Sequence, residues 1–290
     1  MKVSIFERLT SRKKRLSRLK QRVLDYLSSL PKDQILEDQL KVIDFLRNNE
    51  ISVFPYEFTK EYDPKDIEIF RDTQLDLFYT HLDGKKLYYK SGTSKTKAQK
   101  YFNSLLLEQD NRSPHRYLKD NFNVEQNDVI VDVGAAEGNF SLSVIEKARH
   151  IYLFEPDKNW IKALKGTFAP YSDKVTITQK FVSDSPLHEC ITLDEYFKEN
   201  REVNFIKADV EGAEAQVIKG ASTIIEHQKN LKIAICTYHR QEDADDLDVL
   251  LKELGFSNSF SNGYMLYYYG RTNIVREPYL RKAVLRAVKQ

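Results

Sequence analysis

The 290-residue chain is predicted to be an α/β protein, with a doubly wound, mostly parallel sheet and a mainly helical N-terminal extension. From Asn127 onward, short apolar runs alternate with stretches at helical spacing, which is typical of βαβ units. The uninterrupted run Val129-Ile130-Val131 indicates a strand buried on both faces. Near the C-terminus, Asn262-Gly263 separates Gly255–Ser261 from Tyr264–Tyr269 and predicts an antiparallel hairpin, because Asn-Gly suits a two-residue type I′ turn.

The remaining elements follow from apolar periodicity. The expected sheet strands are Val129–Val133, Ile151–Phe154, Val175–Val182, Val203–Ala208 and Leu231–Cys236, with helices near 139–149, 158–167, 213–228 and 242–254. The extension, residues 1–114, is expected to contain helices near 1–30, 32–48 and 97–107, an extended segment at Ile51–Phe58 and a hairpin at Asp83-Gly84. The core domain would span 115–270, and a basic tail helix is expected within 271–290.

Composition excludes several classes of protein. The 45 Lys and Arg residues nearly balance the 43 Asp and Glu residues, so the net charge of +2 gives no reason to expect a nucleic-acid partner. Cys190 and Cys236 are too few for a disulfide framework and are expected to be free thiols. No apolar run approaches the roughly 18–20 residues that cross a bilayer, and no secretory signal is recognised. A cytoplasmic protein is therefore expected.

The first helix is unusually basic. Its cations are Arg8, Arg12, Lys13, Lys14, Arg15, Arg18, Lys20 and Arg22, and a leucine stripe follows the same helix. The simpler interpretation is a solvated helix that packs its leucines on the rest of the protein. The alternative is peripheral contact with an anionic membrane surface or a glycan-assembly partner, at the inner face of the membrane.

A glycine turn is the strongest functional signal. The strand ending at Val133 runs directly into Gly134 and Gly138, and a helix follows at about Asn139. Glycines let a ligand approach the backbone closely, and a helix N-terminus favours an electronegative group. Neither the dinucleotide nor the P-loop glycine spacing is present. The spacing, with Asp132 two residues earlier, suits the amino-acid end of S-adenosylmethionine, and the expected cofactor-binding residues here are Asp132, Gly134, Ala135, Glu137, Gly138 and Asn139.

Two further segments are expected to complete a nucleotide-type site. Glu155, followed by Pro156, ends the next strand about twenty residues after the turn, where α/β folds place an acid that accepts hydrogen bonds from ribose hydroxyls. Ser183 and Asp184 follow the third strand, where Asp184 could accept from an adenine amine. Turn chemistry alone explains Ser183-Asp184 equally well.

Candidate catalytic residues follow the fourth and fifth strands. Lys207, Asp209 and Glu211 lie at the carboxyl end of one strand, and His239 follows the next, so they should meet at the same edge of the sheet. A neutral His239 could accept the proton of an acceptor hydroxyl. Asp209 and His239 could alternatively share a divalent ion, although two ligands are too few to assign one.

Together these segments resemble the FkbM family of methyltransferases over about residues 128–270. The matching segments are Asp132-Val-Gly134-Ala-Ala-Glu-Gly138, Glu155-Pro156, Thr192-Leu193-Asp194, Phe205-Ile-Lys-Ala-Asp209-Val-Glu211-Gly-Ala-Glu214 and Tyr238-His239. The resemblance implies a class I, Rossmann-like methyltransferase fold, S-adenosylmethionine as donor, and O-methylation of a hydroxyl, often on sugars of bacterial surface glycans or natural products. Tyr88, Tyr89 and Tyr117 are candidate sugar-stacking surfaces.

Two competing hypotheses remain at this point. A nicotinamide-dependent oxidoreductase shares the strand, glycine turn and ribose acid but requires a different glycine spacing. A non-catalytic partner in a glycan-assembly complex would keep the fold and dock through its basic ends. The acceptor, its methylated position and the oligomeric state are not indicated by the sequence.

Overall fold

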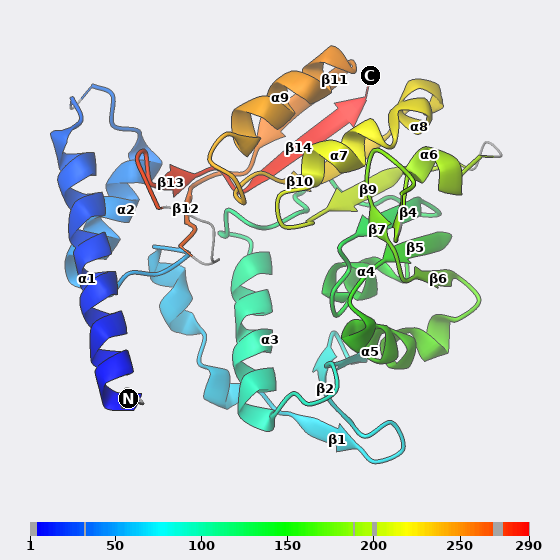
Figure 1. The fold of residues 1–290 in the computed structure, drawn as a ribbon, viewed down its shortest axis with the longest axis horizontal. Helices are drawn as coiled ribbons and strands as arrows, with labels where there is room; N and C mark the ends of the chain where they lie inside the picture. Colours follow the sequence, from blue (N-terminus) through cyan, green and yellow to red (C-terminus); the bar gives the residue numbers. More distant parts are fainter. Residues whose placement is uncertain (1–4, 32, 188, 199–201, 269–274, 290) are drawn as a thin grey trace.

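The computed structural model describes residues 5–31, 33–187, 189–198, 202–268 and 275–289, with a seven-stranded sheet at the centre (Figure 1). In spatial order its strands are β11 (Phe256–Phe260), β14 (Val284–Lys289), β10 (Lys232–Cys236), β9 (Phe205–Ala208), β4 (Val129–Val133), β5 (His150–Phe154) and β6 (Val175–Thr178). The strands β10, β9, β4, β5 and β6 are parallel neighbours, and β14 runs antiparallel to both β10 and β11. Four of the predicted core strands are thus confirmed with small shifts at their ends, whereas Val175–Val182 is divided: β6 ends at Thr178, and Phe181–Val182 is a separate short strand, β7, that pairs outside this sheet.

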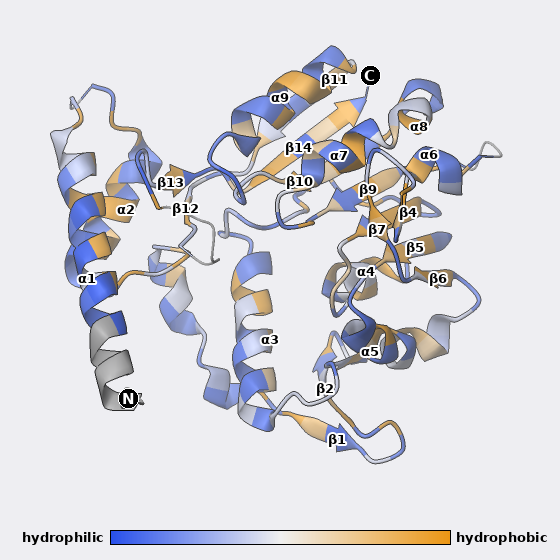
Figure 2. Cartoon of the chain, in the orientation of Figure 1, coloured by the Kyte–Doolittle hydropathy of each residue, from blue (hydrophilic) through white to orange (hydrophobic). Residues whose placement is uncertain are grey.

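Helices cover both faces of this sheet, as the strand–helix alternation predicts. One face carries α3 (Lys95–Gln109), α4 (Asn139–Val144) and α5 (Lys158–Phe168), and the other carries α6 (Leu193–Tyr196), α7 (Glu214–Lys219), α8 (Ser222–His227) and α9 (Asp243–Glu253). The expected helix over 213–228 is therefore two short helices, with a break at Gly220 and Ala221. Apolar strands lie between the two helical layers (Figure 2).

The C-terminal expectations need two corrections. Phe256–Phe260 pairs with β14 rather than with the segment after Asn262-Gly263, so the predicted hairpin has the wrong partner; Tyr269 lies outside the described residues. That segment instead forms β12 (Met265–Leu266), which pairs with β13 (Leu280–Arg281). The predicted tail helix is also wrong, because Val284–Lys289 is a strand inside the sheet, and the core domain extends well beyond residue 270.

The reason lies in the burial of β14. Its first four residues are all buried, so the strand lacks the alternation that reveals a half-exposed strand, and its Ala, Leu, Arg and Lys residues favour helix locally. Pairing with β10 on one side and β11 on the other overrides that local preference. The antiparallel strand β14 lies between β10 and β11. This insertion distinguishes the sheet from the plain dinucleotide-binding order.

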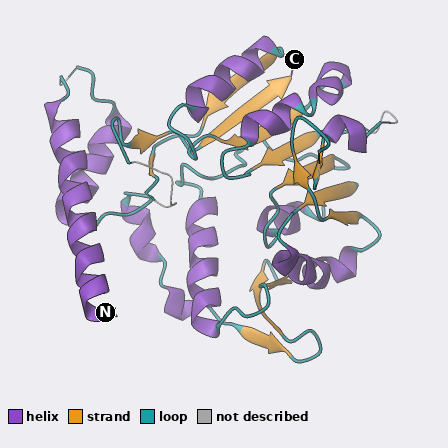
Figure 3. Cartoon of the chain, viewed as in Figure 1, coloured by secondary structure: helices purple, strands orange, loops and turns teal. Residues whose placement is uncertain are grey.

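The N-terminal extension divides into two parts (Figure 3). The helices α1 (Ile5–Ser29) and α2 (Glu37–Asn48) are confirmed and pack with the β12–β13 segment in a separate apolar cluster. The hairpin of β2 (Leu77–Leu82) and β3 (Lys85–Tyr88) is confirmed, and Asp83 and Gly84 both have positive φ, as a type I′ turn requires. Ile51–Phe58 forms no strand and leads into the 3₁₀ helix η1 (Glu57–Glu61).

The short elements complete the fold around this frame. They are β1 (Phe70–Asp72), β7 (Phe181–Val182), β8 (Cys190–Ile191), and the 3₁₀ helices η2 (Pro64–Asp66) and η3 (Ala169–Tyr171). Among the described residues, none of the helices combines the length and apolar character needed to span a bilayer. Because β4, β5, β9 and β10 are parallel, their carboxyl ends meet at one edge, which brings the segments that follow these strands together.

Candidate active site

The glycine turn after β4 is packed directly against the end of β9. Gly134 has φ +75°, and its N–H donates to the Phe154 carbonyl at 2.9 Å. A Cβ on Gly134 would lie 1.9 Å from the Asp209 carbonyl oxygen, a separation that no side chain tolerates. Gly138 also has positive φ, +83°, and forms the N-cap of α4. The turn therefore needs glycine both for its backbone conformation and for the close approach of Asp209.

A buried ion pair supports the turn from below. Lys207 Nζ lies 3.0 Å from Asp132 Oδ1 and donates to the Gly134 carbonyl at 2.7 Å. Ser141 Oγ donates to the second Asp132 oxygen at 2.7 Å. Burial by itself lowers the pKa of Lys207, but Asp132 and Asp209 outweigh it and the pKa rises well above its ordinary value. Here Lys207 and Asp132 hold the turn in place, and Asp132 is fully buried beneath it.

Glu155 lies beside the turn, as its position at the end of β5 predicts. One carboxylate oxygen accepts from Ala136 N at 2.8 Å and the other from Asp157 N at 2.7 Å. Burial raises the pKa of Glu155, and these two backbone N–H groups partly oppose that rise. A carboxylate held in this way at the edge of the turn still has lone pairs that can accept from a diol.

The N-terminal extension contributes a tyrosine to the same turn. Tyr101, on α3, donates its hydroxyl to Glu137 Oε2 at 2.5 Å, and Glu137 is almost completely buried. Burial raises the pKa of Glu137 to about 7, although the Tyr101 hydrogen bond opposes the rise. Ala135 is also buried in the turn, and its N–H donates to Phe154 O at 3.1 Å. The extension and the core thus share one site.

Asp209 is the centre of the polar cluster at the sheet edge. Tyr117 donates its hydroxyl to Asp209 Oδ2 at 2.9 Å, and His239 Nε2 lies 3.5 Å from Asp209 Oδ1. Burial alone would raise the pKa of Asp209, but the charges of His239, Lys207 and His115 lower it to about 2. Asp209 therefore stays ionised and is too weak a base to take a proton from an alcohol.

A second carboxylate holds the other side of His239. His239 Nδ1 lies 2.8 Å from Glu214 Oε1, and the two side chains are 6% and 1% exposed. The ring N–H does not point straight at this oxygen, so the contact is best described as an ion pair when the imidazole is protonated. Burial lowers the pKa of His239, but Glu214 and Asp209 together raise it above its ordinary value. Glu214 also accepts from Val210 N at 3.0 Å, which fixes its position.

Sequence reasoning missed His115. This residue lies in the loop that follows α3 and is 2% exposed. Its Nε2 is 3.1 Å from the Tyr238 hydroxyl and 3.9 Å from Asp209 Oδ2. Burial lowers its pKa to about 4, so the ring is neutral near pH 7. In the sequence, His115 follows Pro114 and stands two residues before Tyr117, and this segment contains no motif that marks the histidine as functional. Only the fold brings the loop to the end of β9.

The remaining predicted site residues lie around the rim. Glu211 is exposed on the turn after β9, with φ 55°. Ser183 and Asp184 follow β7, and a Cβ on Gly220 would lie 2.1 Å from the Ser183 carbonyl oxygen, so this segment packs tightly against the end of α7. Asn139 and Pro156 are partly buried beside the turn. Tyr88, Tyr89 and Tyr117 are buried, at 4%, 1% and 4% exposure, so the expectation that they form sugar-stacking surfaces is wrong.

Two groups of donor atoms around Asp209 are close enough to share a metal ion. They are His115, Asp209 and Cys236, and Asp209, Glu214 and His239, with the donors of each group within 4.8 Å of one another. In the first group, the Tyr238 hydroxyl already contacts His115 Nε2. In the second, His239 Nδ1 lies 2.8 Å from Glu214 Oε1 and its Nε2 lies 3.5 Å from Asp209 Oδ1, so the three side chains contact one another directly, while Glu214 Oε2 has no hydrogen-bond partner among the described residues. We therefore expect the cluster to act through hydrogen bonds and charge.

Comparisons with known proteins give one family match and several similar solved structures. The model of the methyltransferase FkbM domain matches residues 167–257. No curated protein matches the chain. A crystal structure of methyltransferase FkbM from Methylobacillus flagellatus KT is similar at 18% identity, covering 95% of this chain and 60% of that protein, with a TM-score of 0.45. The chain thus spans less than two thirds of that relative's length.

Two further solved structures are similar over the core. A SAM-dependent O-methyltransferase from Thermotoga maritima has 18% identity, with coverage of 57% of this chain and 60% of its own and a TM-score of 0.37. A putative methyltransferase from Streptococcus mutans, in complex with SAH, has 14% identity, with coverage of 58% and 91% and a TM-score of 0.40. At such scores the fold assignment rests on the sheet order itself. The match of the FkbM domain model to residues 167–257 confirms the predicted resemblance over that segment, which lies within residues 128–270 and does not include the glycine turn or Glu155.

Proposed function

We propose that the protein transfers a methyl group from S-adenosylmethionine to a hydroxyl of a sugar, in a bacterial surface glycan or a related natural product. The observation that carries the proposal is the joint position of the glycine turn, Glu155 and the Asp209–His239–Glu214 cluster at one edge of the sheet. The turn and Glu155 suit the two ends of the donor, and the cluster suits an acceptor hydroxyl.

The donor would be held by groups of known chemistry. Its amino-acid end would lie against the turn from Gly134 to Gly138, where backbone N–H groups and the start of α4 favour a carboxylate. Glu155 would accept from the ribose hydroxyls, and Ser183 and Asp184 are proposed to meet the adenine. Glu137, Asp209 and Asp132 place carboxyl groups around the region, which suits a donor that carries a sulfonium and an ammonium, while Lys207 and His239 are the cations that face Asp209.

Methyl transfer requires an acceptor oxygen in line with the sulfonium methyl and a group that takes the hydroxyl proton. His239 is the proposed base, because Glu214 orients its Nδ1 side and leaves Nε2 facing the Asp209 side of the site. Asp209 stays anionic and stabilises the imidazolium that forms, while Glu211 at the rim is a proposed acceptor contact. Holding donor and acceptor in this geometry supplies most of the acceleration.

An aromatic wall beside His239 suits a sugar. The Tyr267 ring is T-shaped to Tyr238 at 5.0 Å and to His239 at 5.7 Å between centroids, and its side chain is partly exposed. Tyr117 lies on the other side of Asp209 but is only 4% exposed, so Tyr267 is the ring that a sugar could reach. Aromatic faces combined with charged hydrogen-bonding groups form sites with one apolar and one polar surface. A small-molecule or glycan acceptor fits this environment, and the oligomeric state is left open.

The test combines calorimetry with turnover. The protein should bind S-adenosylhomocysteine and show no heat with NAD, because its glycine spacing differs from the dinucleotide fingerprint. With labelled donor and fractionated surface glycans or nucleotide-sugar precursors, a 14-dalton gain should appear on the product. His239→Ala should keep donor binding and lose about 10²–10⁴-fold in turnover. Heat with NAD alone would establish the oxidoreductase alternative, and donor binding without turnover on any glycan fraction would favour the non-catalytic partner.

The basic α1 helix is the basis of a separate proposal on location. Arg12, Lys14, Arg15 and Arg18 are exposed, and α1 stands at the edge of the molecule away from the sheet (Figure 1). We infer that α1 lets a cytoplasmic protein rest on the anionic inner face of the membrane, near glycan assembly. Binding to vesicles that contain anionic lipid should exceed binding to neutral vesicles and should weaken with salt. Equal sedimentation with both vesicle types would refute the idea.

A further inference from the structure

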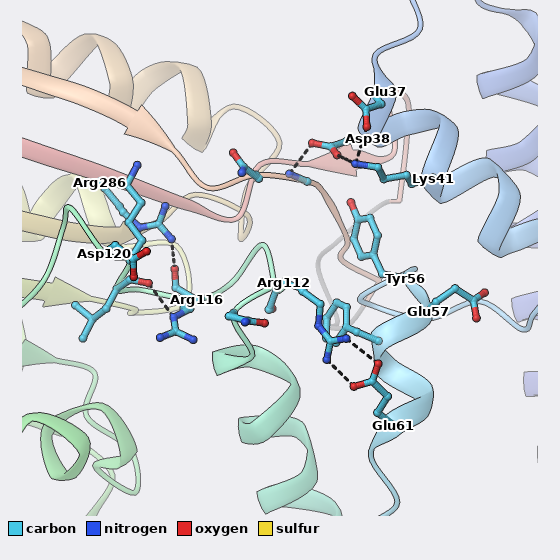
Figure 4. Close-up of a pocket in the computed structure, with 17 residues that line it drawn as sticks. Glu37, Asp38, Lys41, Tyr56, Glu57, Glu61, Arg112, Arg116, Asp120 and Arg286 are labelled. Atoms are coloured by element: carbon cyan, nitrogen blue, oxygen red, sulfur yellow. Dashed lines mark hydrogen bonds and ion pairs between the residues drawn. The ribbon is translucent and has the colours of Figure 1, made fainter.

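A large polar cavity lies apart from the glycine turn. It measures about 890 Å³ and is enclosed by α2, η1, the loop over residues 111–120, the turn at Asn262-Gly263 and β14 (Figure 4). None of the residues predicted to bind the donor lines it. The two ends of this cavity differ in charge. At the α2–η1 end, cations and acids neutralise one another, whereas at the β14 end they do not.

The cations at the α2–η1 end all have carboxylate partners. Lys41 lies 3.0 Å from Glu37 and 3.1 Å from Asp38. Arg112 forms ion pairs with Glu61 at 2.7 Å and with Asp110 at 2.8 Å. This end is therefore a solvated set of compensated charges, which needs no ligand.

The β14 end contains a buried guanidinium without such a partner. Arg286 is 5% exposed; its Nε donates to Tyr117 O at 2.8 Å and its Nη2 to Arg116 O at 2.6 Å. Both acceptors are backbone carbonyls, and no carboxylate among the described residues forms an ion pair with Arg286. Burial and the charge of Arg116 lower the pKa of Arg286 to about 10. A buried cation without a counter-charge is costly and is rarely kept without one.

Arg116 repeats this pattern beside Arg286. Its Nε donates to Leu118 O at 2.9 Å and its Nη1 to Gln109 O at 3.2 Å, again both backbone carbonyls. Lys119 lines the same end, and the acid there, Asp120, is exposed and forms no ion pair with either arginine among the described residues. Figure 4 shows Arg116 and Arg286 side by side with Asp120 at this end. Both arginines thus lack a carboxylate partner among the described residues, and guanidinium groups are the side chains that most often bind phosphate and carboxylate groups in proteins.

We propose that Arg286 and Arg116, with Lys119, form a binding site for a phosphate or carboxylate group, and that this site anchors the charged part of the acceptor. Tyr117 connects it to the reaction centre, because its carbonyl accepts from Arg286 and its hydroxyl donates to Asp209. The buried side chain of Tyr117 is thus the link between the anion site and the Asp209–His239 cluster. The second half of the proposal rests on the proposed function, whereas the anion site itself does not.

The experiment measures anion binding to the full chain by calorimetry, with inorganic phosphate and glucuronate as separate probes and sodium chloride at matched ionic strength as the reference. Binding of phosphate alone would indicate a phosphorylated acceptor, and binding of glucuronate alone a uronic acid. Binding of both probes would indicate a site that recognises negative charge without distinguishing phosphate from carboxylate. In each case Arg286→Gln and Arg116→Gln should weaken binding at least tenfold, because two guanidiniums share the anion. Arg112→Gln, whose cation is already paired, should change the affinity less than twofold.

S-adenosylhomocysteine binding provides the independent readout of folding and of the donor site. The glutamine variants should retain it, and Arg116→Gln, whose side chain is only partly buried, carries the test if Arg286→Gln does not fold. Absence of binding for both anions in the wild type, or unchanged affinity in both glutamine variants, would overturn the proposal. Loss of S-adenosylhomocysteine binding in the wild type would overturn the donor assignment instead and leave the anion site standing.

Discussion

The substitution Glu214→Gln tests the role of His239 most sharply, because it removes one charge and almost no volume. Glu214 Oε1 lies 2.8 Å from His239 Nδ1, and both side chains are nearly inaccessible, so solvent screens the pair very little. A contact between charged hydrogen-bonding groups contributes about 1.5–3 kcal/mol, and one pKa unit corresponds to about 1.4 kcal/mol. The variant should therefore lower the pKa of His239 by about one to two units.

This shift has a defined sign in a pH–rate profile. The base must be neutral to accept a proton, so kcat/KM should rise with pH through the pKa of His239, which in the wild type lies above its ordinary value. In Glu214→Gln this limb should move to lower pH by about one to two units, and the plateau should fall by roughly threefold to tenfold because the imidazole is a weaker base. Glu242→Gln, an exposed residue paired with Arg276, is the matched control.

Stability gives a second readout of the same pair. A raised folded-state pKa means that His239 stabilises the protein fully below its unfolded pKa of about 6.5 and loses this contribution as pH rises through the folded-state pKa. The difference in unfolding free energy between wild type and Glu214→Gln should thus be larger at pH 5.5 than at pH 8.5. An acid limb that stays in place in Glu214→Gln, with an unchanged plateau, would refute the assignment of His239 as the base.

Three further predictions concern the turn, the missed histidine and the metal. Gly134→Ala should lower the free energy of unfolding by at least about 2 kcal/mol in chemical denaturation, because the new Cβ would meet the Asp209 carbonyl oxygen. Gly92 has a similar φ but open space around it, so Gly92→Ala should cost only about 1 kcal/mol. Equal losses in the two variants would mean that the close approach of Asp209 is unimportant. Burial lowers the pKa of His115 to about 4 from an ordinary 6.5. The neutral ring therefore contributes fully to the free energy of unfolding above about pH 6.5, and about 3 kcal/mol of that free energy is lost as pH falls towards 4. His115→Gln should remove that loss and the exposed His81→Gln should not; identical pH dependence in wild type and His115→Gln would contradict it. Dialysis against EDTA should leave turnover within about twofold, and restoration of a lost activity by a divalent ion would show that the donors around Asp209 hold a metal.

The central strands, the glycine turn and the acid at the end of β5 could be predicted from sequence because each depends on local pattern. A buried strand that runs into Gly134 can be recognised from a few residues, and so can an acid at the end of the next strand. The order of the C-terminal strands could not, because β14 pairs with β10 and β11 across long stretches of chain and its own residues favour helix. Local pattern identified the Asn262-Gly263 turn but not the partner of Phe256–Phe260.

The residues of the candidate site also form two groups: those that local pattern predicts, and those that only the fold brings together. Asp209 and His239 were predicted from their places at strand ends, whereas the Lys207–Asp132 pair and His115 follow from contacts between distant segments. Lys207 illustrates the limit: its position beside Asp209 suggested a catalytic cation, yet its ammonium group lies beneath the turn. Burial and pairing, which decide whether a charged side chain faces a ligand or holds the fold, cannot be read from spacing.

A crystal structure with S-adenosylhomocysteine tests the account most directly. In that structure the homocysteine carboxylate should contact backbone N–H groups between Gly134 and Gly138, Glu155 should accept from both ribose hydroxyls, and the sulfur should face Asp209 and His239. A ligand bound elsewhere, or bound in this crevice with its sulfur turned away from His239, would contradict it.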